Sequence, residues 1–177
     1  GTDASADVAR PQPPSGASVH QMDVAWSDQE GHVFHFADLR GSPAVVLMFY
    51  GTCQSVCPIL ISDVLRLEAA LAPDARQRTR FVLVTFDPAV DTPERLRALA
   101  AERHMDTTRW TLLRGTDDDI RTLATVLGVQ YSRIGPSDFT HSNLITVLDP
   151  QGQVARQLEG LRQPVDALAR AIEAFPH

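Results

Sequence analysis

The sequence predicts one α/β domain in which helices flank a central mixed sheet and an N-terminal β-hairpin precedes that sheet. A continuous apolar run, 44–50, and a second, mostly apolar segment, 80–86, are typical of strands that are buried on both faces of a sheet. A segment with helical features follows each run, and this β-α-β order indicates parallel strands joined by crossover helices. Two strand-like segments around a tight turn, 144–148 and 153–158, add antiparallel strands, so the sheet is expected to be mixed.

The first 19 residues differ in composition from the rest of the chain. They are rich in Ala, Asp, Pro and Ser, and Pro11, Pro13 and Pro14 stand close together. This composition is typical of a disordered tether. We therefore expect a tether over 1–19 and a folded domain over 20–177.

The first half of the domain begins with the hairpin. Residues 24–26 and 32–36 alternate in character on either side of the turn 28–31, which is typical of two paired strands. The buried strand 44–50 comes next. A helix is expected over 58–71, because its apolar residues recur at helical spacing.

The second half starts at the buried strand 80–86. Thr92 is the expected N-cap of the next helix, and Pro93 suits its first position. Gly128 is the expected C-cap of a later helix whose first turn is acidic. The elements expected here are helices over 93–104, 117–127 and 164–175, strands over 110–113, 144–148 and 153–158, and a turn over 149–152.

Composition excludes several classes of protein. The 177 residues carry a net charge of −6, and all sixteen basic residues are Arg. An acidic chain of this kind lacks the basic face of a nucleic-acid binder, and the absence of Lys excludes a P-loop and Schiff-base lysine chemistry. With only two Cys, a multi-disulfide scaffold and a Cys₄ zinc site are also excluded. We expect a monomer.

The two cysteines, Cys53 and Cys57, are the first candidate functional residues. They lie between a buried strand and a helix, at the sheet edge where α/β proteins place their ligands. The positive end of the helix is expected to favour the thiolate of Cys57. A passive disulfide is the alternative, although so short a loop would remove little entropy from the unfolded chain.

Two thiolates form a soft site that suits Cu(I), zinc or iron-sulfur chemistry. Structural zinc and iron-sulfur clusters need four ligands, whereas Cu(I) accepts three, so a histidine would complete a copper site. His141 is the best placed, because it precedes the strand 144–148 and would lie near the cysteines if that strand neighbours 44–50. From spacing alone, His141 is either a ligand or a satisfied histidine at the end of a strand.

The other histidines have simpler interpretations. His20 lies close to the tether, His177 ends the chain, His104 suits a helix C-terminus, and His32 and His35 belong to the hairpin.

Acidic residues follow the second buried strand at the same edge of the sheet. Asp91 and Thr92 have the pattern of helix-capping residues. Asp87 ends the apolar strand, and it either shapes the turn or orients the metal ligands through hydrogen bonds.

Three motifs together resemble those of the Sco/SenC family. Residues 53–58 match its C-x-x-x-C-P motif, 86–93 match a strand that ends in D-P followed by D-T-P, and His141 precedes an apolar strand and a D-P-x-G-like turn. The three stand in the family's order and cover roughly residues 22–175. Many members carry a His directly before the first Cys, whereas this chain has Gly51-Thr52 there.

The resemblance implies a thioredoxin-like fold and copper, as Cu(I) or Cu(II), bound by Cys53, Cys57 and His141. Asp87 matches an acidic position beside the ligands that the family links to the geometry of the copper site or to copper transfer. It implies a metallochaperone that serves the copper A site of cytochrome c oxidase by delivering copper or by maintaining thiols. The implied partners are the oxidase subunit that carries this site, other copper chaperones and thioredoxin-like reductants. The implied location is periplasmic or extracytoplasmic, with a membrane anchor upstream of Gly1.

An enzyme is the rival interpretation. A thiol-disulfide oxidoreductase that reduces cysteines of a partner would use Cys53 and Cys57 as its redox-active pair. Thioredoxin-like oxidoreductases typically carry a C-x-x-C motif and a cis-proline before the later strand. This chain has C-x-x-x-C instead, and Thr140-His141 at the position of the proline. A peroxidase-like enzyme resembles the fold but not the residues around Cys53.

Overall fold

The structure is a computed structural model that describes residues 17–136 and 138–176. A five-stranded sheet has the order β5-β4-β3-β8-β9. Its strands are β3 (Ala44–Phe49), β4 (Arg80–Thr85), β5 (Trp110–Leu113), β8 (Leu144–Leu148) and β9 (Val154–Glu159). The central strand β3 pairs parallel with β4 and antiparallel with β8, which confirms the predicted mixed sheet.

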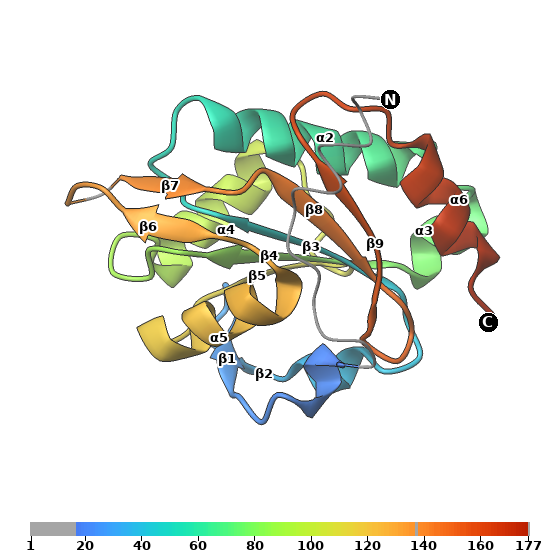
Figure 1. Ribbon diagram of the computed structural model, residues 1–177, viewed down its shortest axis with the longest axis horizontal. Helices are drawn as coiled ribbons and strands as arrows, with labels where there is room; N and C mark the ends of the chain where they lie inside the picture. The colour runs from blue at the N-terminus through green and yellow to red at the C-terminus, as the bar shows by residue number, and fades with distance from the viewer. Residues whose placement is uncertain (1–16, 137, 177) are drawn as a thin grey trace.

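Helices cover both faces of this sheet (Figure 1). α2 (Val56–Ala70) lies on one face with α6 (Asp166–Ala174) beside it, and α5 (Asp117–Leu127) lies on the other. The N-terminal hairpin, β1 (Trp26–Ser27) and β2 (Val33–Phe34), lies on the α5 side. The predicted hairpin is therefore confirmed, although its strands are shorter than expected.

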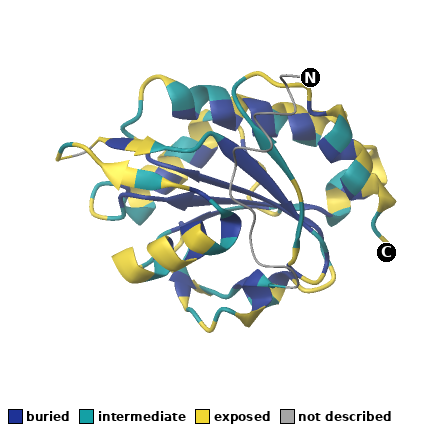
Figure 2. Ribbon diagram, in the orientation of Figure 1, coloured by how far each residue is buried: buried dark blue, intermediate teal, exposed yellow. Residues whose placement is uncertain are grey.

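The central strands β3 and β8 form the core because their sequences are almost wholly apolar. All residues of β3 and β8 are buried, and Figure 2 shows these strands running between helices whose outer sides are exposed. Burial of each large apolar side chain contributes about 1.5–3 kcal/mol, so this sheet is the rigid base on which the loops at its edge are held.

The predicted helix caps are confirmed. The Thr92 hydroxyl accepts a hydrogen bond from the Arg95 amide at the start of α4 (Pro93–Glu102). Gly128 ends α5 with a φ of 74°, a left-handed conformation that glycine adopts without steric cost.

Several elements were not predicted. A short helix, α3 (Pro73–Arg78), follows α2, and two 3₁₀ helices, η1 (Val19–Gln21) and η2 (Phe36–Leu39), flank the N-terminal hairpin. A second hairpin pairs β6 (Tyr131–Arg133) with β7 (Phe139–His141) outside the main sheet.

The folded domain begins before the predicted boundary. Ser18 bridges to Gln153, and Val19 is fully buried. Most of the expected tether, residues 1–16, and His177 lie outside the described residues. No helix in the described part of the chain is both long and apolar enough to cross a membrane.

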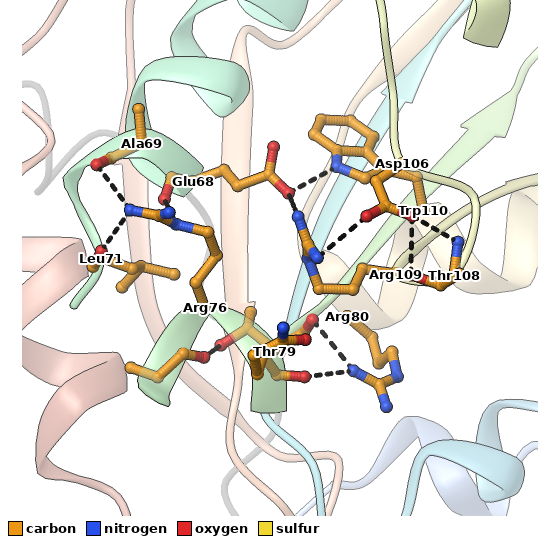
Figure 3. Close-up of polar contacts among 12 residues, drawn as sticks. Glu68, Ala69, Leu71, Arg76, Thr79, Arg80, Asp106, Thr108, Arg109 and Trp110 are labelled. Atoms are coloured by element: carbon orange, nitrogen blue, oxygen red, sulfur yellow. Dashed lines mark hydrogen bonds and ion pairs between the residues drawn. The ribbon is translucent and has the colours of Figure 1, made fainter. Parts of the chain in front are cut away.

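Arginines fasten the end of α2 that is remote from the cysteines (Figure 3). The guanidinium of Arg76 donates to the carbonyls of Glu68, Ala69 and Leu71 at the C-terminal end of α2, where a helix has few amides left to pair with its last carbonyls. The Glu68 carboxylate accepts from Arg109 at 2.9 Å and from the Trp110 indole at 3.0 Å. α2 is thus tied to the start of β5, which fixes the helix whose other end carries Cys57.

Candidate metal centre

Three potential metal ligands converge at the carboxyl end of β3. Cys53 lies in the loop after β3, Cys57 in the first turn of α2, and His141 at the end of β7. One donor atom from each lies within 4.8 Å of the others, and this is the only such group of His, Cys, Asp or Glu in the described chain. The structure therefore brings together the three residues that the sequence singled out.

The prediction about which thiol the helix activates was wrong. Burial raises the pKa of Cys53, but hydrogen bonds from the backbone amides of Cys57, Ser55 and Val56 outweigh it and lower the pKa to about 7. The Cys57 amide donates to Cys53 Sγ at 3.4 Å. Because the Ser55 side chain makes no capping bond, Cys53 takes the place of an N-cap side chain on α2.

Cys57 is the protonated partner of the pair. Its side chain is buried inside the first turn, and this burial is the main cause that raises its pKa to about 12. The nearby charges of Cys53 and Asp91 raise it further. At neutral pH, Cys53 is therefore the reactive thiol and Cys57 keeps its proton until a strong electrophile or a metal displaces it.

His141 is held in the tautomer that a metal ligand needs. Its Nδ1 lies 2.9 Å from the carbonyl oxygen of Ser142. A carbonyl only accepts hydrogen bonds, so Nδ1 carries the proton and Nε2 presents its lone pair. This Nε2 lies 3.6 Å from Cys57 Sγ.

The position of His141 in the fold differs from the predicted one. It does not open β8 but ends β7, whose partner β6 places Tyr131 opposite it. Its ring packs edge-on against Tyr50 with centroids 5.8 Å apart, and lies 5.3 Å from Phe86. His141 nevertheless reaches the cysteines for the predicted reason, because β8 neighbours β3.

Asp91 holds the cysteine loop, a role that the sequence analysis missed when it assigned this residue to helix capping. The buried Asp91 carboxylate accepts hydrogen bonds from the Gly51 amide at 2.9 Å and from the Thr85 hydroxyl at 2.5 Å. A Cβ atom at Gly51 would overlap Asp91 Oδ1, so this contact needs glycine. The only available signal was the D-T-P spacing, which also fits a simple cap.

Asp87 does not join the three donor residues. Its carboxylate is buried; Oδ1 lies 3.6 Å from Arg133 Nη2, and Oδ2 has no hydrogen-bond partner among the described residues. The Arg133 guanidinium also donates to the Pro136 carbonyl and lies over the Phe139 ring, 4.6 Å from its centre. Asp87 therefore contacts the β6–β7 hairpin that carries His141, rather than the donor groups themselves.

The site can accept a metal with little rearrangement. Donors that bind one metal at about 2.0–2.3 Å lie roughly 3.5–4 Å apart when three surround it. The 3.6 Å between Cys57 Sγ and His141 Nε2 fits this arrangement. Cys53 and His141 are partly exposed, and a cleft of about 520 Å³ lined by residues 130–132 and 140–142 opens beside His141. A partner can thus approach the donor atoms from solvent.

Comparison with known proteins identifies the family. A family model described as SCO1/SenC matches residues 13–175. The chain belongs to the SCO1/SenC family. This confirms the resemblance drawn from the three sequence motifs.

Solved structures of SCO1/SenC proteins share the fold. A SCO1/SenC family lipoprotein from Bacillus anthracis is 25% identical with a TM-score of 0.78, covering 85% of this chain and 91% of that one. Yeast Sco1 with copper bound is 20% identical with a TM-score of 0.74, covering 94% and 91%. These likenesses confirm the thioredoxin-like fold.

A curated relative matches over part of its length. A SCO2-like protein of Rickettsia typhi is 23% identical over 132 residues, which are 71% of this chain and 63% of that protein. The match therefore spans less than two thirds of that relative's length.

Proposed function

We propose that this SCO1/SenC protein carries copper as cargo, held by Cys53 Sγ, Cys57 Sγ and His141 Nε2. The observation that supports this most directly is the convergence of these three donors with His141 in the ligand-competent tautomer. Two sulfurs and one imidazole suit Cu(I), and three ligands leave a face open. Copper-bound structures are known for the family members from yeast and Bradyrhizobium japonicum.

The chain's own groups account for uptake and release. Cys53 is the more ionised thiol, so it offers the first sulfur, and Cys57 must lose its proton as the second. A Cys or His of a partner then enters through the open face, and the metal passes to it by ligand exchange without covalent change in this protein. Both thiols must be reduced for this, so an oxidising compartment requires an upstream reductant.

Anaerobic titration of the reduced protein tests the ligand set. We expect one equivalent of Cu(I) to be retained against a competing chelator, and Cu(II) to give sulfur-to-copper charge-transfer absorption. In His141→Ala we expect the fold to be kept, Cu(II) binding to be lost and Cu(I) binding to weaken. His32→Ala, whose side chain is 78% exposed, is the matched control. Unchanged copper affinity in His141→Ala would sink the three-ligand proposal.

We further propose that the copper serves the copper A site of cytochrome c oxidase from outside the cytoplasm. In support, one similar structure is described as a Sco family member of the cytochrome c oxidase assembly proteins, and the Bacillus anthracis relative is a lipoprotein. Deletion of the gene in its host is expected to lower oxidase activity, with rescue by the wild type but not by Cys53→Ser. Full oxidase activity after deletion would refute this assignment.

A thiol-disulfide oxidoreductase is the second candidate, and the unequal thiols favour it. A pair with one pKa near 7 and one near 12 has the polarity of an attacking and a resolving thiol. Turnover on a disulfide substrate, measured for the wild type and for Cys53→Ser, distinguishes the two. Reductase turnover without copper retention would favour the enzyme.

A further inference from the structure

A groove on the outer side of α2 lies apart from the donor atoms. It has a volume of about 480 Å³ and is lined by Pro58, Ile59, Ser62, Asp63, Arg66 and Arg162. Pro58 directly follows Cys57, so the groove begins one residue from the proposed copper site. Its floor at Pro58 and Ile59 is half-buried and apolar, whereas its rim carries guanidinium groups.

The rim is built around one buried carboxylate. Asp63 Oδ1 accepts from Arg66 at 2.7 Å, and Oδ2 accepts from the backbone amide of Arg162 at 2.9 Å. Arg66 also donates to the Gln163 carbonyl, which ties the β9–α6 connection to α2 (Figure 1). Both carboxylate oxygens of Asp63 are thus paired, so Asp63 offers no free negative charge to the groove.

Arg162 has an unusual backbone conformation. Its φ is 56°, in the left-handed region that favours glycine, and the Asp63 bond to its amide holds it there. Its side chain is exposed, and within the described residues its guanidinium makes no hydrogen bond or ion pair. Backbone strain is enriched at functional sites, and Arg162 combines it with an exposed guanidinium.

A third arginine stands on the other side of the same helix. Arg103 donates to the Ser62 hydroxyl at 2.8 Å and lies 3.5 Å from the Pro58 carbonyl. Arg66, Arg103 and Arg162 therefore surround the exposed turns of α2 that follow Cys57. The chain as a whole has a net charge of −6, so three arginines around one stretch of α2 contrast with the overall charge and would attract an acidic segment.

We propose that this groove docks an acidic segment of the partner polypeptide that exchanges copper with the site. Its apolar floor would accept an apolar side chain, and its guanidinium groups would pair with carboxylates. Docking here would hold the partner against Pro58, one residue along the chain from Cys57. The partner's role rests on the proposed copper function. Docking itself needs no metal, so it can be tested independently of copper binding.

The test uses two synthetic peptides without copper ligands, one with a run of glutamates beside a leucine and one with glutamines in their place. We expect the glutamate peptide to shift the amide resonances of Ile59, Ser62 and Arg162, and binding to weaken roughly tenfold in Arg162→Gln. Binding should vanish at about 1 M salt, where the Debye length is about 3 Å. Arg121→Gln, the same charge change on the opposite face of the sheet, should bind as the wild type does.

Three results would overturn the proposal: equal binding of both peptides, resonance shifts confined to other surfaces, or unchanged affinity in Arg162→Gln. This variant keeps the backbone bond to Asp63, so it is expected to fold. If Arg162→Gln lowered the melting temperature, Arg162→Lys would separate charge from stability, because it keeps the charge and should bind the glutamate peptide.

Discussion

Asp91→Ala tests whether the cysteine loop is held from β4 and the turn after it. The Asp91 carboxylate accepts from the Thr85 hydroxyl in the core and from the Gly51 amide at the exposed edge. Hydrogen bonds to a charged group contribute about 1.5–3 kcal/mol. We assign about 2–3 kcal/mol to the Thr85 bond and about 1 kcal/mol to the Gly51 bond, which water can replace. The free energy of unfolding should therefore fall by at most roughly 3–4 kcal/mol, because losing a buried charge offsets part of this.

The same variant should change the cysteines. Without the bond to Gly51, the loop no longer holds Cys53 Sγ against the first amides of α2, so its pKa should rise from about 7 toward the ordinary 9.0. Urea denaturation measures the stability change, and the pH dependence of iodoacetamide alkylation measures the pKa. Asp23→Ala, at an exposed site outside any helix, is the control and should change neither. A loss below about 1 kcal/mol with an unshifted alkylation midpoint would refute the reasoning.

Four further outcomes are expected. In the reduced wild type, mass spectrometry should show Cys53 alkylated with a midpoint near pH 7 and Cys57 alkylated only at far more alkaline pH. Alkylation of both cysteines with the same midpoint would contradict the difference between their pKa values. The apparent affinity for Cu(I) should rise about tenfold per pH unit above pH 7, because only Cys57 must then lose a proton on binding. Below pH 7 it should rise about a hundredfold per unit, because Cys53 must lose a proton too. If the affinity measured by chelator competition did not depend on pH, neither thiol would be a ligand. Arg133→Gln should destabilise the protein by only about 1 kcal/mol, because Arg133 is half-exposed and water weakens its ion pair with Asp87. It should also speed amide hydrogen exchange in the β6–β7 hairpin, and unaltered exchange would show that Asp87 does not anchor this hairpin. Glu68→Ala should lower the free energy of unfolding by about 2–3 kcal/mol in urea denaturation, since the Trp110 indole loses its acceptor and Arg109 keeps only its bond to Asp106. A neutral result would mean that water replaces the carboxylate.

The sequence predicted the main sheet well because its strands carry strong local signals. The apolar runs that became β3 and β4 can only be satisfied by burial on both faces, and Thr92 and Gly128 mark helix ends through their own backbone chemistry. The β6–β7 hairpin carries no comparable signal. Its strands have three residues each, and β6 has no buried residue, so periodicity cannot reveal it.

The site was predictable in its residues but not in its electrostatics. Spacing placed Cys53 and Cys57 at the edge of the sheet, and the order of the strands brought His141 to them. Which thiol ionises depends on where the amides at the start of α2 point, and this follows from loop geometry. Gly51, the partner of Asp91 in the cysteine loop, is 40 residues away in the chain, beyond the reach of a local pattern.

The three donors belong to two parts of the structure with different anchorage. Cys53 lies in the loop between β3 and α2, and Cys57 lies in α2, two elements that the core and the Glu68 contacts fix. His141 lies instead on a two-stranded ribbon outside the main sheet. A metal ion bound by all three donors would link the ribbon to the rest of the domain. Loading would then be a mechanical event as well as a chemical one, because the full and empty forms would differ in how stiffly the ribbon is held. A partner that contacts the ribbon would then bind the metal-loaded and the empty protein differently.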